Sequence, residues 1–143
     1  MKKVFTLILV SVFLLSLSLC VYAASTNYSF SSGTCYKSFK TSGSLTKSSS
    51  QTWSGYTVSV SSVSYSAGDN TKNYLIARPI SADGTVLYSS AKTVQAGGST
   101  AFTPNTSGSS ANTVKFKIYN AYYSEQSDST HNMVSRGSVS GTL

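Results

Sequence analysis

The residues best suited to acid–base chemistry lie close together near the C-terminal end. Glu125, Asp128 and His131, the only histidine, form the densest cluster of titratable groups in the chain. A Ser–His–Asp hydrolase needs a nucleophile, a base and an orienting acid in contact, usually supplied by distant segments of a rigid scaffold. Here the candidates are neighbours in one polar segment, and the sequence has no Gly-x-Ser-x-Gly elbow. We expect a solvated loop, and a cell-wall or matrix hydrolase built on these residues remains an alternative.

Cys35 is the other potentially reactive group. Together with His131 it could form a thiol nucleophile pair, but one Cys and one His cannot supply the three or four ligands of a zinc site. The only other cysteine, Cys20, lies in the N-terminal leader described below. Cys35 is therefore either buried and inert or free to form an intermolecular disulfide. We predict no catalytic set, no metal site and no cofactor.

Aromatic and basic side chains indicate binding rather than catalysis. Aromatic rings on a sheet can stack against sugars or bases, and neighbouring lysines would suit a polyanionic glycan. Tyrosine also fills half-buried strand positions for reasons unconnected with a ligand. The candidate binding residues are Trp53, Lys115, Lys117, Tyr119, Tyr122 and Tyr123.

These residues must be positioned by β-strands, because apolar and polar residues alternate with period two and no segment after the leader keeps a helical apolar face. From Thr113 to Tyr119, three apolar residues share one face and two lysines share the other. From Gly55 to Tyr65 the apolar phase changes at Ser61–Ser62, which predicts a β-bulge. Met133–Leu143 is expected to be a last strand, packed against another backbone at Gly137 and Gly141.

A hairpin is expected around Asp83-Gly84 as a two-residue type I′ turn between strands 73–82 and 85–94. That register pairs Ile80 with Leu87 and Ile76 with Ala91 on one apolar face. Pro79 cannot donate to a ladder, which predicts an edge strand in this hairpin. The Ser- and Gly-rich segment 105–111 is expected to be a loop.

Many short strands with turns about every eight to twelve residues predict an all-β fold. We expect an antiparallel β-sandwich of about seven to nine strands, either immunoglobulin-like or jelly-roll, with a flexible Ser/Thr-rich connection near 41–52.

Residues 1–23 have the pattern of a signal peptide: Lys2-Lys3, a largely apolar run, and small residues before a cut after Ala23. Residues 24–143 then form a single domain, which we expect to be secreted or associated with the cell surface. An uncleaved anchor and a lipoprotein whose lipid is carried by Cys20 are the alternatives. Otherwise the membrane is contacted only through the signal peptide before cleavage.

The formal net charge is +7, and removal of Lys2 and Lys3 with the leader leaves +5. Such a surface attracts anionic polymers through a salt-sensitive field. The bases are spread along the chain, so we expect a cell-wall polymer or glycan as partner and no specific nucleic acid. The oligomeric state is left open.

The Lys-Lys leader, the lone Cys35 and a Tyr/Ser/Thr-rich β domain with Tyr65-Ser66-Ala67-Gly68 after a strand resemble small exported proteins of Gram-positive bacteria. Some of that group are similar to bacteriocin-like or cell-surface proteins. The resemblance implies no site residue. The export signal, the mild basic charge and the missing catalytic set favour a secreted, non-catalytic surface-contact or binding protein at the bacterial cell envelope, with a small antibacterial protein or toxin as the alternative.

Overall fold

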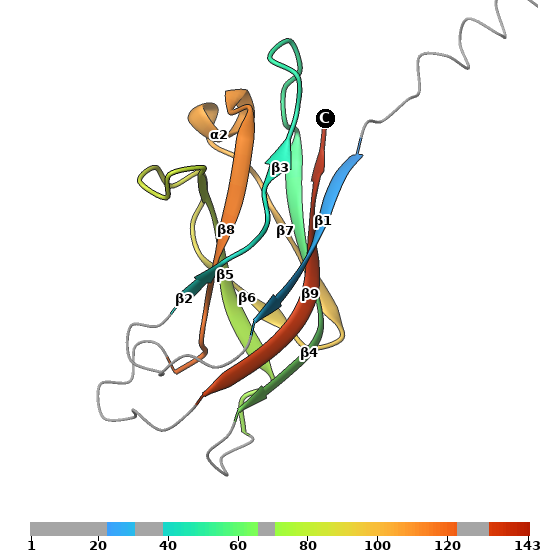
Figure 1. Ribbon diagram of the computed structural model, residues 1–143, viewed down its shortest axis with the longest axis vertical. Helices are drawn as coiled ribbons and strands as arrows, with labels where there is room; N and C mark the ends of the chain where they lie inside the picture. Colours follow the sequence, from blue (N-terminus) through green and yellow to red (C-terminus); the bar gives the residue numbers. More distant parts are fainter. Residues whose placement is uncertain (1–22, 31–38, 66–70, 123–131) are drawn as a thin grey trace, which may run out of the picture.

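A computed structural model describes residues 23–30, 39–65, 71–122 and 132–143, the first range by its backbone alone. Figure 1 shows the elements in these ranges. In chain order they are β1 (Ala23–Phe30), β2 (Phe39–Thr41), β3 (Leu45–Thr46), β4 (Gly55–Tyr65), β5 (Tyr74–Ser81), β6 (Lys92–Gln95), β7 (Gly98–Phe102), α2 (Thr106–Ser110), β8 (Thr113–Tyr119) and β9 (Met133–Thr142).

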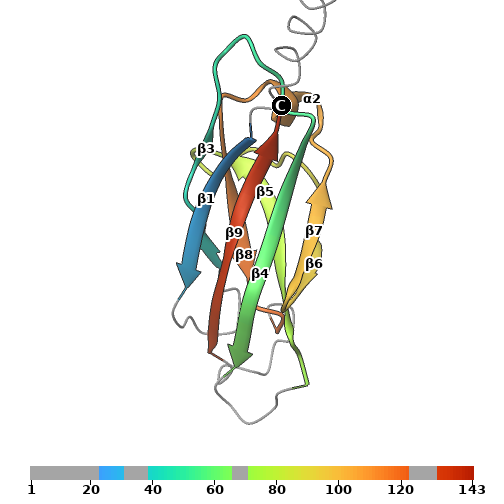
Figure 2. The ribbon, with the colours of Figure 1, turned by 90° about the vertical axis from the view of Figure 1, so that its right-hand side faces the viewer.

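The strands form two antiparallel sheets packed face to face. One sheet has the order β1-β9-β4-β7, and Figure 2 shows its outer side. The other has the order β2-β8-β5-β6, and β3 pairs with β8 further along the same edge as β2. The predicted all-β sandwich is confirmed.

The pairing pattern is that of a jelly roll. Partners are nested like the two arms of one long hairpin: β1 pairs with β9, β2 and β3 with β8, β4 with β7, and β5 with β6. This ribbon is rolled so that β9 also pairs with β4 and β8 with β5. Of the two sandwich types expected from the sequence, the described strands match the jelly roll.

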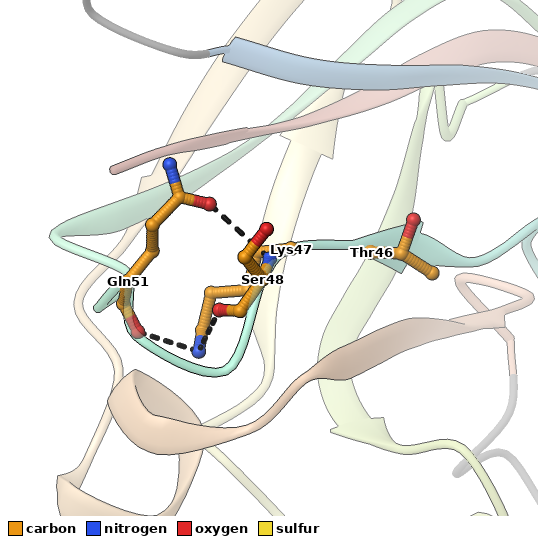
Figure 3. A pocket seen from close by; sticks show the side chains of 4 residues that line it. All are labelled: Thr46, Lys47, Ser48 and Gln51. Atoms are coloured by element: carbon orange, nitrogen blue, oxygen red, sulfur yellow. Dashed lines mark hydrogen bonds between the residues drawn. The ribbon is translucent and has the colours of Figure 1, made fainter.

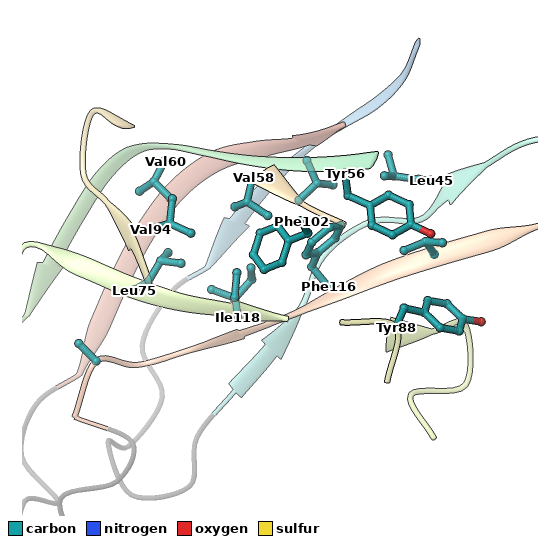
Figure 4. Packing of buried hydrophobic residues seen from close by; sticks show 14 of the residues in the cluster. Leu45, Tyr56, Val58, Val60, Leu75, Tyr88, Val94, Phe102, Phe116 and Ile118 are labelled. Atoms are coloured by element: carbon teal, nitrogen blue, oxygen red, sulfur yellow. The ribbon is translucent and has the colours of Figure 1, made fainter. Parts of the chain in front are cut away.

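The core lies between the sheets and follows the predicted alternation. In β8, Val114, Phe116 and Ile118 are fully buried, while the residues between them are half-buried on the outer side. They meet apolar side chains of β4, β5, β6 and β7, as Figure 4 shows. In β4 the register shifts between Val60 and Ser62, which confirms the predicted bulge.

The last strand, β9, lies where the sequence predicts it, but Gly141 has a different neighbour from the expected one. A Cβ added to Gly141 would lie 2.3 Å from Cζ3 of Trp53. The close contact is therefore with an indole ring and not with another backbone. Glycine at this position leaves room for the ring.

The turn at 81–84 differs from the predicted one. The Gly84 N–H donates to the Ser81 carbonyl at 3.0 Å, so Ala82 and Asp83 are the central residues, and Gly84 follows with φ +81°. The expected Ile80–Leu87 pair is present as an isolated bridge. Beyond it the expected pairing fails, because Ile76 lies opposite Thr93 rather than Ala91.

The predicted apolar face of this hairpin is the outer face of its sheet. Leu75 and Ala77 point into the core and are fully buried, whereas Ile76 has the opposite orientation. Pro79 lies in β5, which is an inner strand of its sheet. The pairing of β5 with β6 ends at Ala77, and the Pro79 carbonyl instead accepts from the Tyr88 N–H at 3.0 Å. The edge strand predicted for this hairpin is β6.

The segment 41–52 is more than a connection. It contains β3, where Leu45 is only 1% exposed. Ser42 is also buried, and its hydroxyl accepts from the Phe116 N–H at 2.9 Å, which satisfies β8 where the edge is interrupted. The segment 105–111, expected to be a loop, contains α2, and the side-chain oxygen of Asn105 caps this helix by accepting from the Gly108 N–H at 2.8 Å.

Candidate basic binding face

Cross-strand pairing brings basic and aromatic side chains together on the outer face of the five-stranded sheet. Lys117 lies opposite Thr41 in β2 and opposite Arg78 in β5. One row further along, Tyr119 lies between Phe39 and Ile76. Residues opposite each other in an antiparallel pair project from the same face. We call this surface the basic face; it consists of Phe39, Thr41, Ile76, Arg78, Lys115, Lys117 and Tyr119.

Phe39 is the most exposed ring of the basic face. Its side chain is 43% exposed, and its ring centroid lies 5.9 Å from that of Tyr119. The Lys117 ammonium nitrogen lies 4.6 Å from the Phe39 centroid. This is within the range of a cation–π interaction, which holds the lysine over the ring while its charge stays near solvent.

The positive charge of the basic face is not neutralised by the described residues. In the ranges given above, the only Asp or Glu side chain is that of Asp83, and it forms no ion pair with Lys115 or Lys117. Arg78 donates through Nε to the Ser89 carbonyl at 3.2 Å, a bond that fixes the side chain without cancelling its charge. The face therefore presents a local positive field.

A hollow opens beside the lysines, between β2 and the 81–84 turn. Its volume is about 340 Å³. Lys115 and Lys117 contribute two neighbouring side chains of β8. The lining residues are Phe39, Thr41, Ile80, Ala82, Asp83, Gly84, Lys115 and Lys117.

Asp83 is fixed at this hollow by its own turn. Its carboxylate accepts from the Ser81 hydroxyl, from the Thr85 N–H at 3.1 Å and from the Thr85 hydroxyl at 2.8 Å. These hydrogen bonds, that of Ser81 above all, lower the pKa of Asp83 to about 2. The carboxylate is therefore ionised at neutral pH and held in one orientation.

Trp53, a predicted binding residue, is not on this face. It is 1% exposed, and its indole N–H donates to the Ala111 carbonyl at 2.8 Å. The ring packs on Gly141 and lies 5.7 Å from the ring of Tyr56. Because both its surface and its N–H are used within the fold, Trp53 cannot stack against a ligand here, and the structure corrects its place in the predicted site.

Tyr122 is likewise buried. It is 2% exposed and packs edge-on against Tyr65, with 5.0 Å between the ring centroids. The ammonium of Lys72 lies 3.9 Å from the Tyr122 ring centroid. Tyr122 is therefore part of the core and is removed from the predicted surface. Tyr123 lies outside the described residues.

Of the six predicted binding residues, Lys115, Lys117 and Tyr119 lie on the basic face. Sequence reasoning missed its other members. Arg78 could have been found, because it shares the parity of Ile76 and Ile80 in an expected strand. Phe39 could not be placed in the same way, because β2 is three residues long and gives no alternation to read.

A second hollow of about 430 Å³ is lined by Thr46, Lys47, Ser48 and Gln51, as Figure 3 shows. The Lys47 ammonium donates to the carbonyl oxygens of Gln51 at 2.6 Å, Ser110 at 3.2 Å and Ser48 at 3.4 Å. The three N–H donors of Lys47 thus hold the loop 47–51 against Ser110 of α2. This arrangement explains Lys47 without a ligand.

The groups proposed for catalysis, Cys35, Glu125, Asp128 and His131, lie outside the described residues. Within the described part of the chain, no three His, Cys, Asp or Glu side chains gather as a metal site would require. No helix in those same ranges has the length and apolar character needed to cross a membrane.

No family model matches the sequence, and no curated protein matches it. Among solved structures, the chain is similar to one in the structure of infectious bursal disease virus Gx strain, with 19% identity and a TM-score of 0.40. The match covers 86% of this chain and 32% of the viral one, so this chain spans about a third of that length. A likeness at this level identifies neither a family nor a function.

Proposed function

We propose that this protein is an exported, non-catalytic binding protein that contacts an anionic polymer of the bacterial cell envelope through the basic face. The observation that carries the proposal is the alignment of Lys117 with Arg78 across β8 and β5, next to Lys115 and without a carboxylate partner among the described residues. Export is inferred from the leader pattern in residues 1–23.

The form of the face suits a polymer better than a small metabolite. Three cations lie on two adjacent strands, and successive outward side chains of β8 are about 6.6 to 6.8 Å apart. A chain with regularly spaced anionic groups can contact several of these cations at once. Phe39 and Tyr119 add an apolar margin on which a sugar or polyol backbone can rest.

The outer face of the four-stranded sheet provides a matched control for the basic face. On the four-stranded sheet, Thr57 lies opposite Ser140 and Ser59 opposite Ser138, so this surface is rich in hydroxyl groups. It also carries Arg136, which is exposed on β9. Lys117→Gln and Arg136→Gln each remove one positive charge, but only the first removes it from the basic face.

The test is binding of the purified protein to immobilised wall teichoic acid while NaCl is raised from about 0.05 M to about 0.5 M. The affinity should fall steeply with salt. Lys117→Gln should weaken binding about fivefold, corresponding to about 1 kcal/mol for one cation at an anionic surface, and Arg136→Gln by less than about twofold. Equal losses in the two variants, or no binding at low salt, would rule out the basic face as the binding surface.

A further inference from the structure

The hollow beside Lys115 and Lys117 is bipolar. Lys115 and Lys117 line it from β8, and Asp83 lines it from the 81–84 turn. No ion pair joins the carboxylate to either lysine in the described part of the chain. Opposite charges therefore line one space without neutralising each other.

The carboxylate retains some capacity to bind. Two oxygens of a carboxylate offer about four acceptor positions, and the turn uses three of them. The same three hydrogen bonds fix its direction, so it needs little reorganisation to accept another donor. An ammonium group of a ligand would be the preferred donor, since it also matches the negative charge.

The same carboxylate disfavours a ligand that is anionic throughout. A phosphate between the lysines is attracted to them, whereas a second anionic group beside Asp83 would be repelled. Phe39 and Ile80 add apolar lining to the same hollow. The lining is thus suited to a short group with negative charge at one end and positive charge at the other.

The hollow is large enough for such a group. Its volume is about 340 Å³, and one water molecule occupies about 30 Å³ in the liquid. One small substituted phosphate group therefore fits in it. The rest of a polymer would have to run along the basic face outside the hollow.

We propose that this hollow binds a zwitterionic phosphate group, with the phosphate held by Lys115 and Lys117 and the amine held by Asp83. The inference deepens the proposed function and rests on it, because the ligand would be an amine-bearing phosphate repeat of the anionic polymer. It assigns Asp83, which the sequence explains as a turn residue, a second role as a specificity determinant.

The test compares two small probes by NMR titration of the full protein, followed at the amides of residues 39–41, 82–85 and 115–117. O-Phosphoethanolamine carries both charges, and glycerol 3-phosphate carries the phosphate without the amine. The protein should bind O-phosphoethanolamine about two to five times more tightly, the range expected of one solvent-accessible ion pair.

Three variants test which side chains cause the preference for O-phosphoethanolamine. Asp83→Asn keeps an acceptor for the turn and should abolish the preference while leaving glycerol 3-phosphate bound at least as well. Lys115→Gln combined with Lys117→Gln should weaken both probes. Thr85→Val retains the carboxylate and should keep the preference, which separates the charge of Asp83 from the shape of the turn.

Equal binding of the two probes by the unaltered protein, or a preference that survives Asp83→Asn, would overturn the inference. Failure to bind either probe would also overturn it. In each of these cases salt-dependent binding to teichoic acid through Lys117 could persist, and the proposed function would then stand without the zwitterionic subsite. Loss of polymer binding itself would contradict the proposed function.

Discussion

Trp53 and Lys117 were predicted to serve the same site, yet they lie in two regions with opposite roles. Around Trp53, each polar atom and each surface is used within the fold: the indole N–H is bonded, the ring lies on Gly141, and the neighbouring Tyr56 hydroxyl donates to the Gly108 carbonyl at 2.6 Å. Around Lys117, charge is left unpaired by the described residues. The buried rings of Trp53 and Tyr56 belong to the core, and the unneutralised bases indicate the binding surface.

This contrast predicts that substitutions around Trp53 change stability, whereas substitutions on the basic face change binding. The largest expected effect is that of Trp53→Ala. Removal of a fully buried indole should lower the free energy of unfolding by about 3–5 kcal/mol, as measured by denaturant titration. A loss below about 1 kcal/mol would mean that Trp53 is not a core residue.

Gly141→Ala should be the next most damaging change, because the new Cβ would lie 2.3 Å from a Trp53 ring atom. Overpacking of this kind costs about 1–3 kcal/mol. Gly55→Ala is the matched control, since its Cβ would meet its nearest neighbour at an ordinary 3.7 Å. The two glycines lie in paired strands.

A double-mutant cycle sharpens this prediction. In the Trp53→Ala background the ring is absent, so Gly141→Ala should cost much less than it does alone. Additive losses would show that the indole is not what limits the space at position 141.

The double variant Lys115→Gln/Lys117→Gln should show the opposite behaviour. Its affinity for teichoic acid should fall about 25-fold, corresponding to about 2 kcal/mol for two cations at an anionic surface. Its midpoint of unfolding should stay close to that of the unaltered protein, because surface substitutions usually change stability by less than about 0.5 kcal/mol. A large loss of stability would show that these lysines serve the fold.

Tyr56→Phe should have a smaller effect, about 1 kcal/mol of unfolding free energy, because one buried hydrogen bond is lost. It should also alter the response to alkaline pH. Burial, and secondarily Tyr88, raise the pKa of Tyr56 above the ordinary tyrosine value of 10.0. The unfolded chain therefore releases this proton first, and stability should fall as pH rises above about 10. Tyr56→Phe should show a shallower loss, and parallel curves for the two proteins would contradict this account.

Long strands with regular alternation could be predicted from the sequence, and short or irregular elements could not. The bounds of β4 and β8 follow from their patterns, and the bulge in β4 follows from the change of phase at Ser61–Ser62. β3 was missed because it contains only two residues in a Ser/Thr-rich segment. Its position depends on pairing with β8, about 70 residues away, which no local pattern reveals.

The candidate site could be predicted only where strand parity applies. Lys115, Lys117 and Tyr119 lie in a regular strand, so their shared face follows from alternation. Trp53 precedes β4 and Tyr122 follows the end of β8, so no parity relates either ring to the sheet. Their burial depends on tertiary neighbours such as Gly141 and Tyr65.

The proposed function requires that the polymer binds to the outer face of the five-stranded sheet. The most direct test is to titrate ¹⁵N-labelled protein with wall teichoic acid at low salt and to map the amide shifts. Binding through the basic face should shift the amides of β2, β5 and β8 around Lys117 and should change β4 and β9 little. Shifts concentrated on β4 and β9 around Arg136, or spread evenly over both sheets, would contradict it.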